Sequence, residues 1–227
     1  MAIQFNLTNP NREYNSQLFS YEQCLRRRKN HRFIGFIDVD EYIVIKGTPI
    51  EPNTTHIHLI QDVLKYFESY GGVMLNWIMM GSRGGKDQRP TDGILTSYTS
   101  CSRNYHAKTI VNTAFVKHRG RKSPHFFQYF EPYYAVDTNL NIVQYAFNPP
   151  NRTEPDESLF SVMYIRHYHL KSRSDFIRRA QRGSATGAPR KTLPYYEAFN
   201  DGLLNTCPTI SYDKSNLIFT NYSTFIK

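Results

Sequence analysis

Two aspartates stand close together in a segment that could bind a metal ion. Asp38 and Asp40 are separated by one residue in the sequence FIGFIDVDEYI, and Glu41 follows directly. Carboxylates this close repel one another unless a positive charge lies among them. A divalent cation, Mn²⁺ or Mg²⁺, would supply that charge and keep open positions for the oxygens of a diphosphate. The alternative is a solvated end of a strand, where the carboxylates pair with Arg or Lys.

A second segment with metal-binding side chains has the sequence IRHYHLKS. A histidine at the end of a strand, His167 or His169, could complete a site begun by the two aspartates, because imidazole is a good ligand for manganese-like metals. Arg166 and Lys171 beside it could hold diphosphate oxygens. A structural histidine and an ordinary surface lysine are the alternatives.

A third segment, LNWIMMGSRGGK, combines an aromatic side chain with small residues. Gly81 and Ser82 open a glycine-rich loop whose backbone could approach a ligand closely and bind anions or sugar hydroxyls. The loop matches neither the Walker A pattern nor the dinucleotide fingerprint, so a plain loop is an equally good interpretation. Trp77, the only tryptophan, is either a core anchor or a stacking platform for a sugar ring.

Apolar runs and helical periodicity predict the elements that carry these segments. Helices are expected over residues 21–30, 58–69, 94–101 and 172–183. Strands are expected over residues 33–37, 42–45, 73–80 and 160–169. Continuous apolarity predicts that the first strand is central in its sheet, and Ser172 or Ser174 is expected to cap the last helix. The alternation of helices and strands predicts an α/β fold.

Length and composition limit the class of protein. The chain has 227 residues, of which 40% are hydrophobic, so we expect one compact domain over residues 1–227 rather than a disordered segment. No apolar run approaches the roughly 18 residues that cross a bilayer, and the N-terminus does not have the pattern of a signal peptide. The net charge of +9 favours polyanionic or phosphate-bearing partners.

The three cysteines predict no disulfide framework. Cys24, Cys101 and Cys207 are widely spaced, odd in number and without a CxxC pair. This pattern argues against both a set of disulfides and a zinc ribbon. Buried or idle thiols are therefore expected.

Taken in order, the motifs resemble the family 92 glycosyltransferases, which have a GT-A fold. The matching segments are FIGFIDVDEYI, LNWIMMGSRGG, KTIV beginning at Lys108, and IRHYHLKSRSDFIRRAQRG, within residues 17–183. The resemblance implies a GT-A-like mixed sheet flanked by helices. It also implies that Asp38 and Asp40 contact the metal and the donor diphosphate, that His167 rather than His169 is the matching histidine, and that the segment from Trp77 to Ser82 borders the acceptor. Lys108 joins the expected substrate-binding residues.

The resemblance further implies a reaction, partners and a location. The family transfers a sugar from a nucleotide sugar, expected here to be a UDP-sugar, to a glycan hydroxyl with inversion, and it is associated with Golgi or secretory membranes. An inverting displacement needs a carboxylate base beside the acceptor and a cation on the leaving diphosphate. Asp92 is the expected base, with a helix N-cap as its alternative role. Glu131 and Asp137 are weaker candidates.

The chain departs from the family at its start. Only 37 residues precede Asp38 and they contain no βαβ unit, whereas a GT-A enzyme has a nucleoside-binding βαβ part there. We therefore expect the C-terminal two thirds of a GT-A fold, an incomplete Rossmann-like half whose activity as a fragment is open.

Two other functions fit parts of the sequence. A strand ending in DxD is also typical of haloacid-dehalogenase-like phosphatases, in which the first Asp is the nucleophile and Mg²⁺ lies alongside. That class usually has a later strand ending in paired acids, and none follows here. A basic, tyrosine-rich module that binds acidic glycans or RNA is the third possibility. No RNP, KH or zinc-knuckle pattern supports a nucleic-acid partner.

Overall fold

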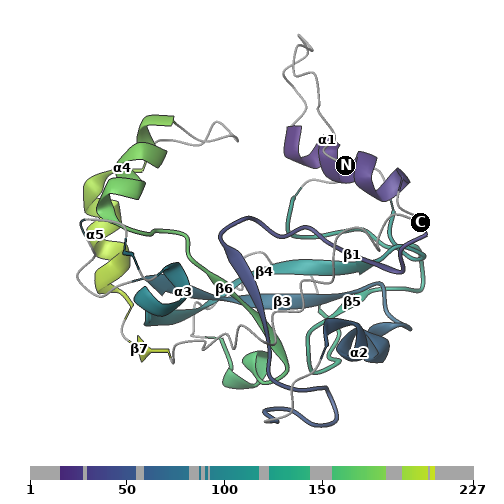
Figure 1. Ribbon diagram of the computed structural model, residues 1–227. Helices are drawn as coiled ribbons and strands as arrows, with labels where there is room; N and C mark the ends of the chain where they lie inside the picture. The colour runs from purple at the N-terminus through teal and green to yellow at the C-terminus, as the bar shows by residue number, and fades with distance from the viewer. Residues whose placement is uncertain are drawn as a thin grey trace. The chain divides into compact units, whose positions relative to one another are not determined.

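Figure 1 shows the chain as a computed structural model with two compact units, each assembled from segments that are distant in the sequence. The structure describes residues 16–27, 30–54, 59–81, 87, 90–91, 93–117, 123–143, 155–182, 191–203 and 205–207. The first unit comprises Met1–Met79, Arg103–His167 and Ser184–Ala188. The second comprises Met80–Ser102, Tyr168–Gly183 and Pro189–Lys227. The expectation of a single domain stays a prediction.

A mixed sheet is the framework of the first unit. Its main strands lie in the order β1 (Phe33–Gly35), β4 (Ser100–Asn112), β3 (Gly72–Gly81), β6 (Met163–His167) and β2 (Glu41–Ile45). The pairs β1–β4 and β2–β6 are antiparallel, whereas β3 runs parallel to β6. The short strand β5 (Ala135–Val136) pairs in parallel with the start of β3. Parallel and antiparallel pairs in one sheet, with helices beside it, confirm the expected mixed α/β class.

Two apolar strands have different places in this sheet. Every residue of β3 is buried, and the strand lies between β4 and β6, as expected of a continuous apolar run. The prediction that the strand at 33–37 is central is wrong, because β1 lies at the end of the strand order. Its apolar side chains pack against a helix instead: the ring of Phe36 stacks on Tyr21 of α1 (Ser16–Arg27) with centroids 4.1 Å apart. The apolar composition of residues 33–37 therefore reflects their contact with α1.

The helices are divided between the two units. In the first unit, α2 (Ile60–Leu64) continues into the 3-10 turn η1 (Lys65–Phe67), and η2 (Glu157–Phe160) precedes β6. In the second unit lie α3 (Ile94–Ser97), α4 (Arg173–Arg182) and α5 (Leu193–Asp201). The helices predicted over 21–30, 58–69 and 172–183 are confirmed with shifted bounds, whereas α5 was not predicted.

One predicted helix and one predicted strand are shorter in the structure. The helix expected over 94–101 ends at Ser97, since Tyr98 has extended backbone angles and Ser100 already belongs to β4. The edge of β4 there pairs with β7 (Asn205–Thr206), and these backbone bonds replace helical ones. The strand expected over 160–169 is limited to β6, because η2 occupies the residues before it.

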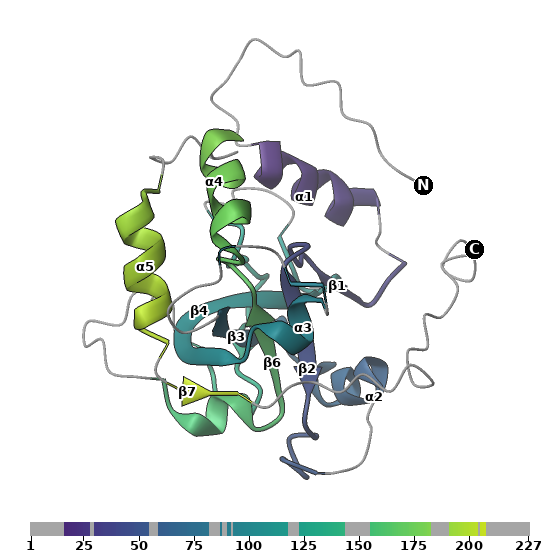
Figure 2. The ribbon, with the colours of Figure 1, turned by 60° about the vertical axis from the view of Figure 1, so that its left-hand side comes forward.

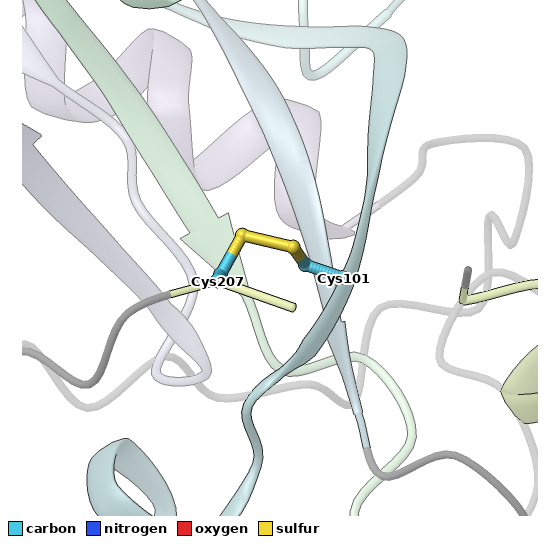
Figure 3. The surroundings of a disulfide bond; sticks show 2 residues. All are labelled: Cys101 and Cys207. Carbon is cyan, nitrogen blue, oxygen red and sulfur yellow. A yellow bond between two sulfur atoms is a disulfide. The ribbon is translucent and has the colours of Figure 1, made fainter. Parts of the chain in front are cut away.

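Cys101 and Cys207 form a disulfide, so the expectation of idle thiols at these positions is wrong (Figure 3). The two cysteines are 106 residues apart in the sequence. They meet because β7 pairs with the start of β4, and the backbone N–H of Cys207 donates to the carbonyl of Thr99 at 2.8 Å. The bond ties the C-terminal segment of the second unit to its sheet edge.

Helices α4 and α5 pack against each other in the second unit, as Figures 1 and 2 both show. Their contact is an apolar cluster of Leu170, Phe176, Ile177, Leu193, Tyr196 and Phe199. Ser172 begins α4 as predicted: its Oγ accepts from the N–H of Asp175 at 3.2 Å and donates to the carboxylate of Asp175 at 2.9 Å. Within the part of the chain that the structure describes, no helix has the length and hydrophobicity needed to cross a membrane.

Candidate active site

The acidic residues lie in a tight turn between β1 and β2 in the first unit. The N–H of Glu41 donates to the carbonyl of Asp38 at 3.0 Å, and the N–H of Asp38 donates to Oε2 of Glu41 at 3.1 Å. These two bonds close the turn over Asp38–Glu41. Val39, at its tip, is 97% exposed. The Glu41 side chain therefore points inward and holds the backbone that carries both aspartates.

Lys108 of β4 provides a positive charge for this turn. Its side chain is 1% exposed, and its Nζ lies 2.9 Å from Oδ2 of Asp38 and 3.6 Å from Oε2 of Glu41. A buried ammonium is tolerated because the two carboxylates compensate it. Part of the counter-charge that was expected from a cation thus comes from the protein itself. Contact between Lys108 and a substrate stays a prediction.

Burial changes the acidity of Glu41. Loss of hydration raises the pKa of its carboxyl from 4.5 to about 7, and the charges of Asp38 and Asp40 act in the same direction. Lys108 and the N–H of Asp38 oppose this shift but do not cancel it. Among the described residues, Oε1 of Glu41 is buried without a hydrogen-bond partner. Glu41 therefore carries only part of a negative charge near neutral pH.

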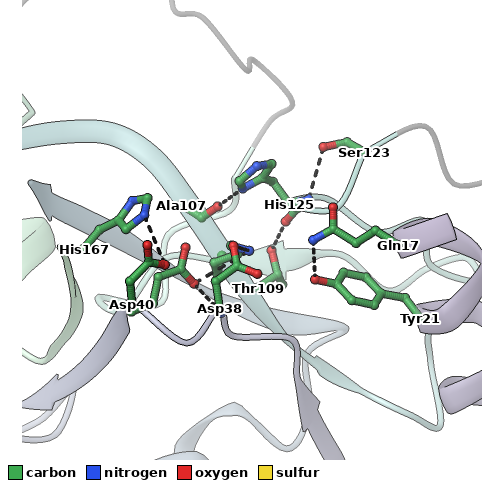
Figure 4. A network of polar contacts seen from close by, with 11 residues as sticks. Gln17, Tyr21, Asp38, Asp40, Ala107, Thr109, Ser123, His125 and His167 are labelled. Atoms are coloured by element: carbon green, nitrogen blue, oxygen red, sulfur yellow. Dashed lines mark hydrogen bonds and ion pairs between the residues drawn. The ribbon is translucent and has the colours of Figure 1, made fainter. Parts of the chain in front are cut away.

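Asp40 faces a histidine rather than the lysine. Its Oδ1 lies 3.7 Å from Nε2 of His167, and Figure 4 shows the two side chains directed toward one another. The sheet brings them together: Glu41 begins β2, His167 ends β6, and these two residues are opposite each other in the antiparallel register. Both side chains are largely buried, at 14% and 7% exposed. The predicted association of an aspartate with His167 is thus present, whereas its metal-binding role stays a prediction.

Trp77 lies among three histidines. Its indole contacts the edge of His167 with ring centroids 4.2 Å apart, and the rings of His106 and His125 follow at 5.3 Å each. Nδ1 of His125 donates to the carbonyl of Ala107, and burial lowers the pKa of this imidazole. Because Trp77 is only 8% exposed, it acts here as a packing surface for imidazoles. Stacking on a sugar ring stays a prediction.

His106 and His125 were not predicted as site residues. A signal existed for His106, which precedes Lys108 by two residues and therefore lies on the same face of β4. Hydrogen bonds to β4 place His125 near Trp77: its Nδ1 donates to the carbonyl of Ala107, and its own carbonyl accepts from the hydroxyl of Thr109. No sequence pattern indicates that position.

A cation fits this arrangement only with oxygens from a substrate. Among the described residues, no group of three or more His, Cys, Asp or Glu side chains converges as a metal site. Asp40 and His167 offer one oxygen and one nitrogen, whereas Asp38 and Glu41 are directed to Lys108. Magnesium-like ions commonly use one or two carboxylates and complete their shell with phosphates and water. The donor set therefore fits a cation bound together with a diphosphate.

The remaining predicted residues are divided between the units. Arg166 in the first unit is buried in β6, and as the neighbour of His167 in a strand it points to the other side of the sheet. Lys171 in the second unit is half-buried, and its carbonyl accepts from the hydroxyl of Tyr196 at 3.1 Å. Substrate contacts of both stay predictions. Asp92 and Ser82 lie outside the described residues.

Gly81 and the weaker base candidates have structural surroundings. A Cβ at Gly81 would lie 2.5 Å from the Cδ1 methyl of Leu203, so the backbone of Gly81 packs closely against the residues at the end of α5. Both oxygens of Asp137 accept hydrogen bonds, from Asn139 and Asn141, in a local turn. Glu131 is exposed and precedes a cis proline. Ligand or base roles for these residues stay predictions.

Comparison with known proteins identifies the family. A family model for glycosyltransferase family 92 matches residues 2–182, which is most of the chain and includes the acidic turn, the Trp77 segment and the β6 histidine. No curated protein matches the sequence. The mixed sheet flanked by helices agrees with a glycosyltransferase fold, and a transferase, rather than a phosphatase or a binding module, is the enzyme class indicated. The chain therefore belongs to glycosyltransferase family 92.

Proposed function

We propose that the chain transfers a sugar from a nucleotide-sugar donor to a glycan hydroxyl with inversion, and that a divalent cation, Mn²⁺ or Mg²⁺, binds at Asp40 and His167. The observation that carries this proposal is the 3.7 Å approach of Oδ1 of Asp40 to Nε2 of His167 at the end of β6. A UDP-sugar is the expected donor. When bound, the cation would neutralise charge on the leaving diphosphate.

The charges of the first unit support a division of roles among the three acids. Lys108 compensates Asp38 and Glu41, so these two residues are suited to holding the turn in place. Asp40 instead directs one carboxylate oxygen toward the imidazole of His167. A neutral imidazole and a carboxylate are compatible ligands for one Mn²⁺, whereas an ammonium would repel it.

The other catalytic groups follow from the reaction. An inverting displacement requires a carboxylate that takes the proton of the acceptor hydroxyl as the new glycosidic bond forms. Asp92 is the proposed base. Lys171 is proposed to hold the diphosphate, whereas Arg166 is buried on the other side of the sheet from His167 and is not assigned to it. Trp77, Gly81 and Ser82 are proposed to border the acceptor.

A location in the secretory pathway is part of the proposal. The bond between Cys101 and Cys207 supports it, since disulfides form and persist in oxidising compartments and are rare in the cytosol. Membership of a glycosyltransferase family agrees with the Golgi, where glycans are extended.

Substitution of the paired residues tests the proposal. We expect Asp40→Asn and His167→Ala each to reduce Mn²⁺-dependent transfer or donor hydrolysis by about 100-fold or more, since removing a metal ligand or its support commonly has effects of this size. Asp62→Asn is the matched control, because Asp62 is an exposed acid of the same unit paired with Lys65. Circular dichroism checks that the variants fold. Retained turnover in Asp40→Asn would contradict the proposed metal role.

A further inference from the structure

A hollow between α4 and α5 in the second unit has an apolar floor and a polar rim. Its volume is about 240 Å³, and it is lined by Phe176, Ile177, Ala180, Gln181, Lys191 and Leu193. This volume is below the roughly 300–1,000 Å³ of pockets that take drug-sized molecules, so it suits a single ring. Four apolar side chains with two polar ones at the edge is the usual composition of a small-molecule site.

Lys191 at the rim is held in place by neutral groups. Its Nζ donates to Nε2 of His169 at 2.6 Å and to the hydroxyl of Tyr195 at 2.8 Å, and it lies 4.3 Å from the centre of the Tyr195 ring. Among the described residues, no carboxylate contacts this ammonium. Its positive charge is therefore fixed in position but not compensated, and one of its three N–H donors remains for a ligand.

A second cationic side chain binds the residue that contacts Lys191. Arg179 of α4 donates to the carbonyl of His169 at 2.8 Å, which brings a guanidinium next to the same residue. The one acid of α4, Asp175, is bound to Arg178 and Ser172. An anion is thus the complementary ligand for the rim, and the apolar floor can receive the C–H face of a ring.

We propose that this hollow binds a sugar ring that carries an anionic group, such as a sulfate, phosphate or carboxylate. The choice of a saccharide as the ligand rests on the proposed function, whereas the choice of an anionic ring rests only on the charge and shape of the hollow. Lys191 and Tyr195 lie beyond residue 182, where the match to the family ends, whereas four other lining residues lie within the match. The site would favour acidic glycans as acceptors.

Binding of three probes tests the proposal. Calorimetry at low salt, without donor or metal, compares N-acetylglucosamine 6-sulfate with N-acetylglucosamine and with inorganic sulfate. We expect the sulfated sugar to bind about tenfold more tightly than either of the others, because it alone uses both the rim and the floor. If inorganic sulfate or the neutral sugar binds as tightly as the sulfated sugar, the proposal is overturned.

Variants separate the contributions of the charge and the hollow. Lys191→Met should weaken binding of the sulfated sugar about tenfold, whereas Arg178→Met removes a paired charge from the same unit and should leave it unchanged. Ala180→Phe should fill the hollow and weaken both sugars but not inorganic sulfate. Unchanged affinity in Lys191→Met would overturn the proposal, and circular dichroism confirms that each variant is folded.

One further variant separates this inference from the proposed function. Asp40→Asn removes the proposed metal ligand in the first unit and should bind the sulfated sugar like the unaltered chain. If the unaltered chain binds the sulfated sugar through Lys191 but has no transferase activity, the proposed site in the hollow is supported and the proposed function is contradicted. Transferase activity without such binding would do the reverse.

Discussion

The two units contain charged clusters of opposite kinds. In the acidic turn of the first unit, Lys108 and Glu41 are almost completely buried, and each charge has an opposite charge within 4 Å. At the rim of the α4–α5 hollow in the second unit, Lys191 is exposed and contacts only neutral groups among the described residues. The first cluster compensates itself, whereas the second leaves a positive charge to the solvent or to a ligand.

This difference separates charges that hold the structure from charges that are available for binding. Removing one partner of a buried pair leaves an uncompensated charge, which destabilises a protein strongly. Removing an exposed charge changes stability little. Substitutions in the first cluster should therefore change the free energy of unfolding, and substitutions in the second should mainly change the affinity for a ligand.

The largest expected effect follows from removing the buried lysine. Lys108→Met should lower the free energy of unfolding by about 3–5 kcal/mol, because Asp38 and Glu41 lose their shared counter-charge. Urea unfolding followed by the fluorescence of Trp77, the only tryptophan and a residue of the first unit, measures this loss. Lys65→Met, which breaks an exposed pair with Asp62, is the control and should lose less than about 1 kcal/mol. Equal losses in both variants would contradict the role of burial.

The second unit should instead depend on its covalent link. Cys207→Ser breaks the bond to Cys101 and should lower stability by about 2–4 kcal/mol, since the disulfide restricts the unfolded chain. Amide hydrogen exchange at Cys101 and Thr206, which belong to the paired edge, measures the local loss. Cys24→Ser, a change in the first unit, should leave these amides protected. Unaltered exchange in Cys207→Ser would show that β7 is held without the bond.

Local patterns predicted the elements and part of the site. Continuous apolarity predicted the strand at 73–80, which is β3, and the serine before α4 identified its cap. The acidic turn was recognised from two aspartates that follow an apolar run. These features are encoded by neighbouring residues, so a single sequence was sufficient to predict them.

Features that depend on pairing between distant segments were not predictable. The approach of Lys108 to Asp38 joins residues 70 apart, and it follows from the register of β1 on β4. The bond between Cys101 and Cys207 follows from two residue pairs between β4 and β7, too few for a sequence pattern. The apolar run at 33–37 was predicted to be central in the sheet. A strand that packs against a helix and a strand with neighbours on both sides are equally apolar, so composition alone does not distinguish them.

A pH effect of intermediate size sharpens the description of the buried cluster. Glu41 has a pKa raised from 4.5 to about 7 in the folded state, so the folded chain binds more protons than the unfolded chain between these values. Its contribution to stability is therefore complete below about pH 4.5, declines as the pH rises through about 7 and is level above that. Glu41→Gln should remove this decline, which is on the order of 3 kcal/mol. Urea unfolding at pH 5 and pH 8, compared with the unaltered chain, measures it. The same decline in the variant would rule out Glu41 as its source.

The smallest expected effect concerns the start of α4. Ser172→Ala removes the acceptor of the Asp175 N–H and the donor to its carboxylate, so stability should fall by about 1 kcal/mol. Ser174→Ala is the matched control, because it keeps both of these bonds and should have less than half the effect. Hydrogen exchange in the first turn of α4 measures the difference. A loss in Ser172→Ala as large as that in Lys108→Met would mean that the second unit, too, depends on a single buried polar group, and the contrast between the two units would not hold.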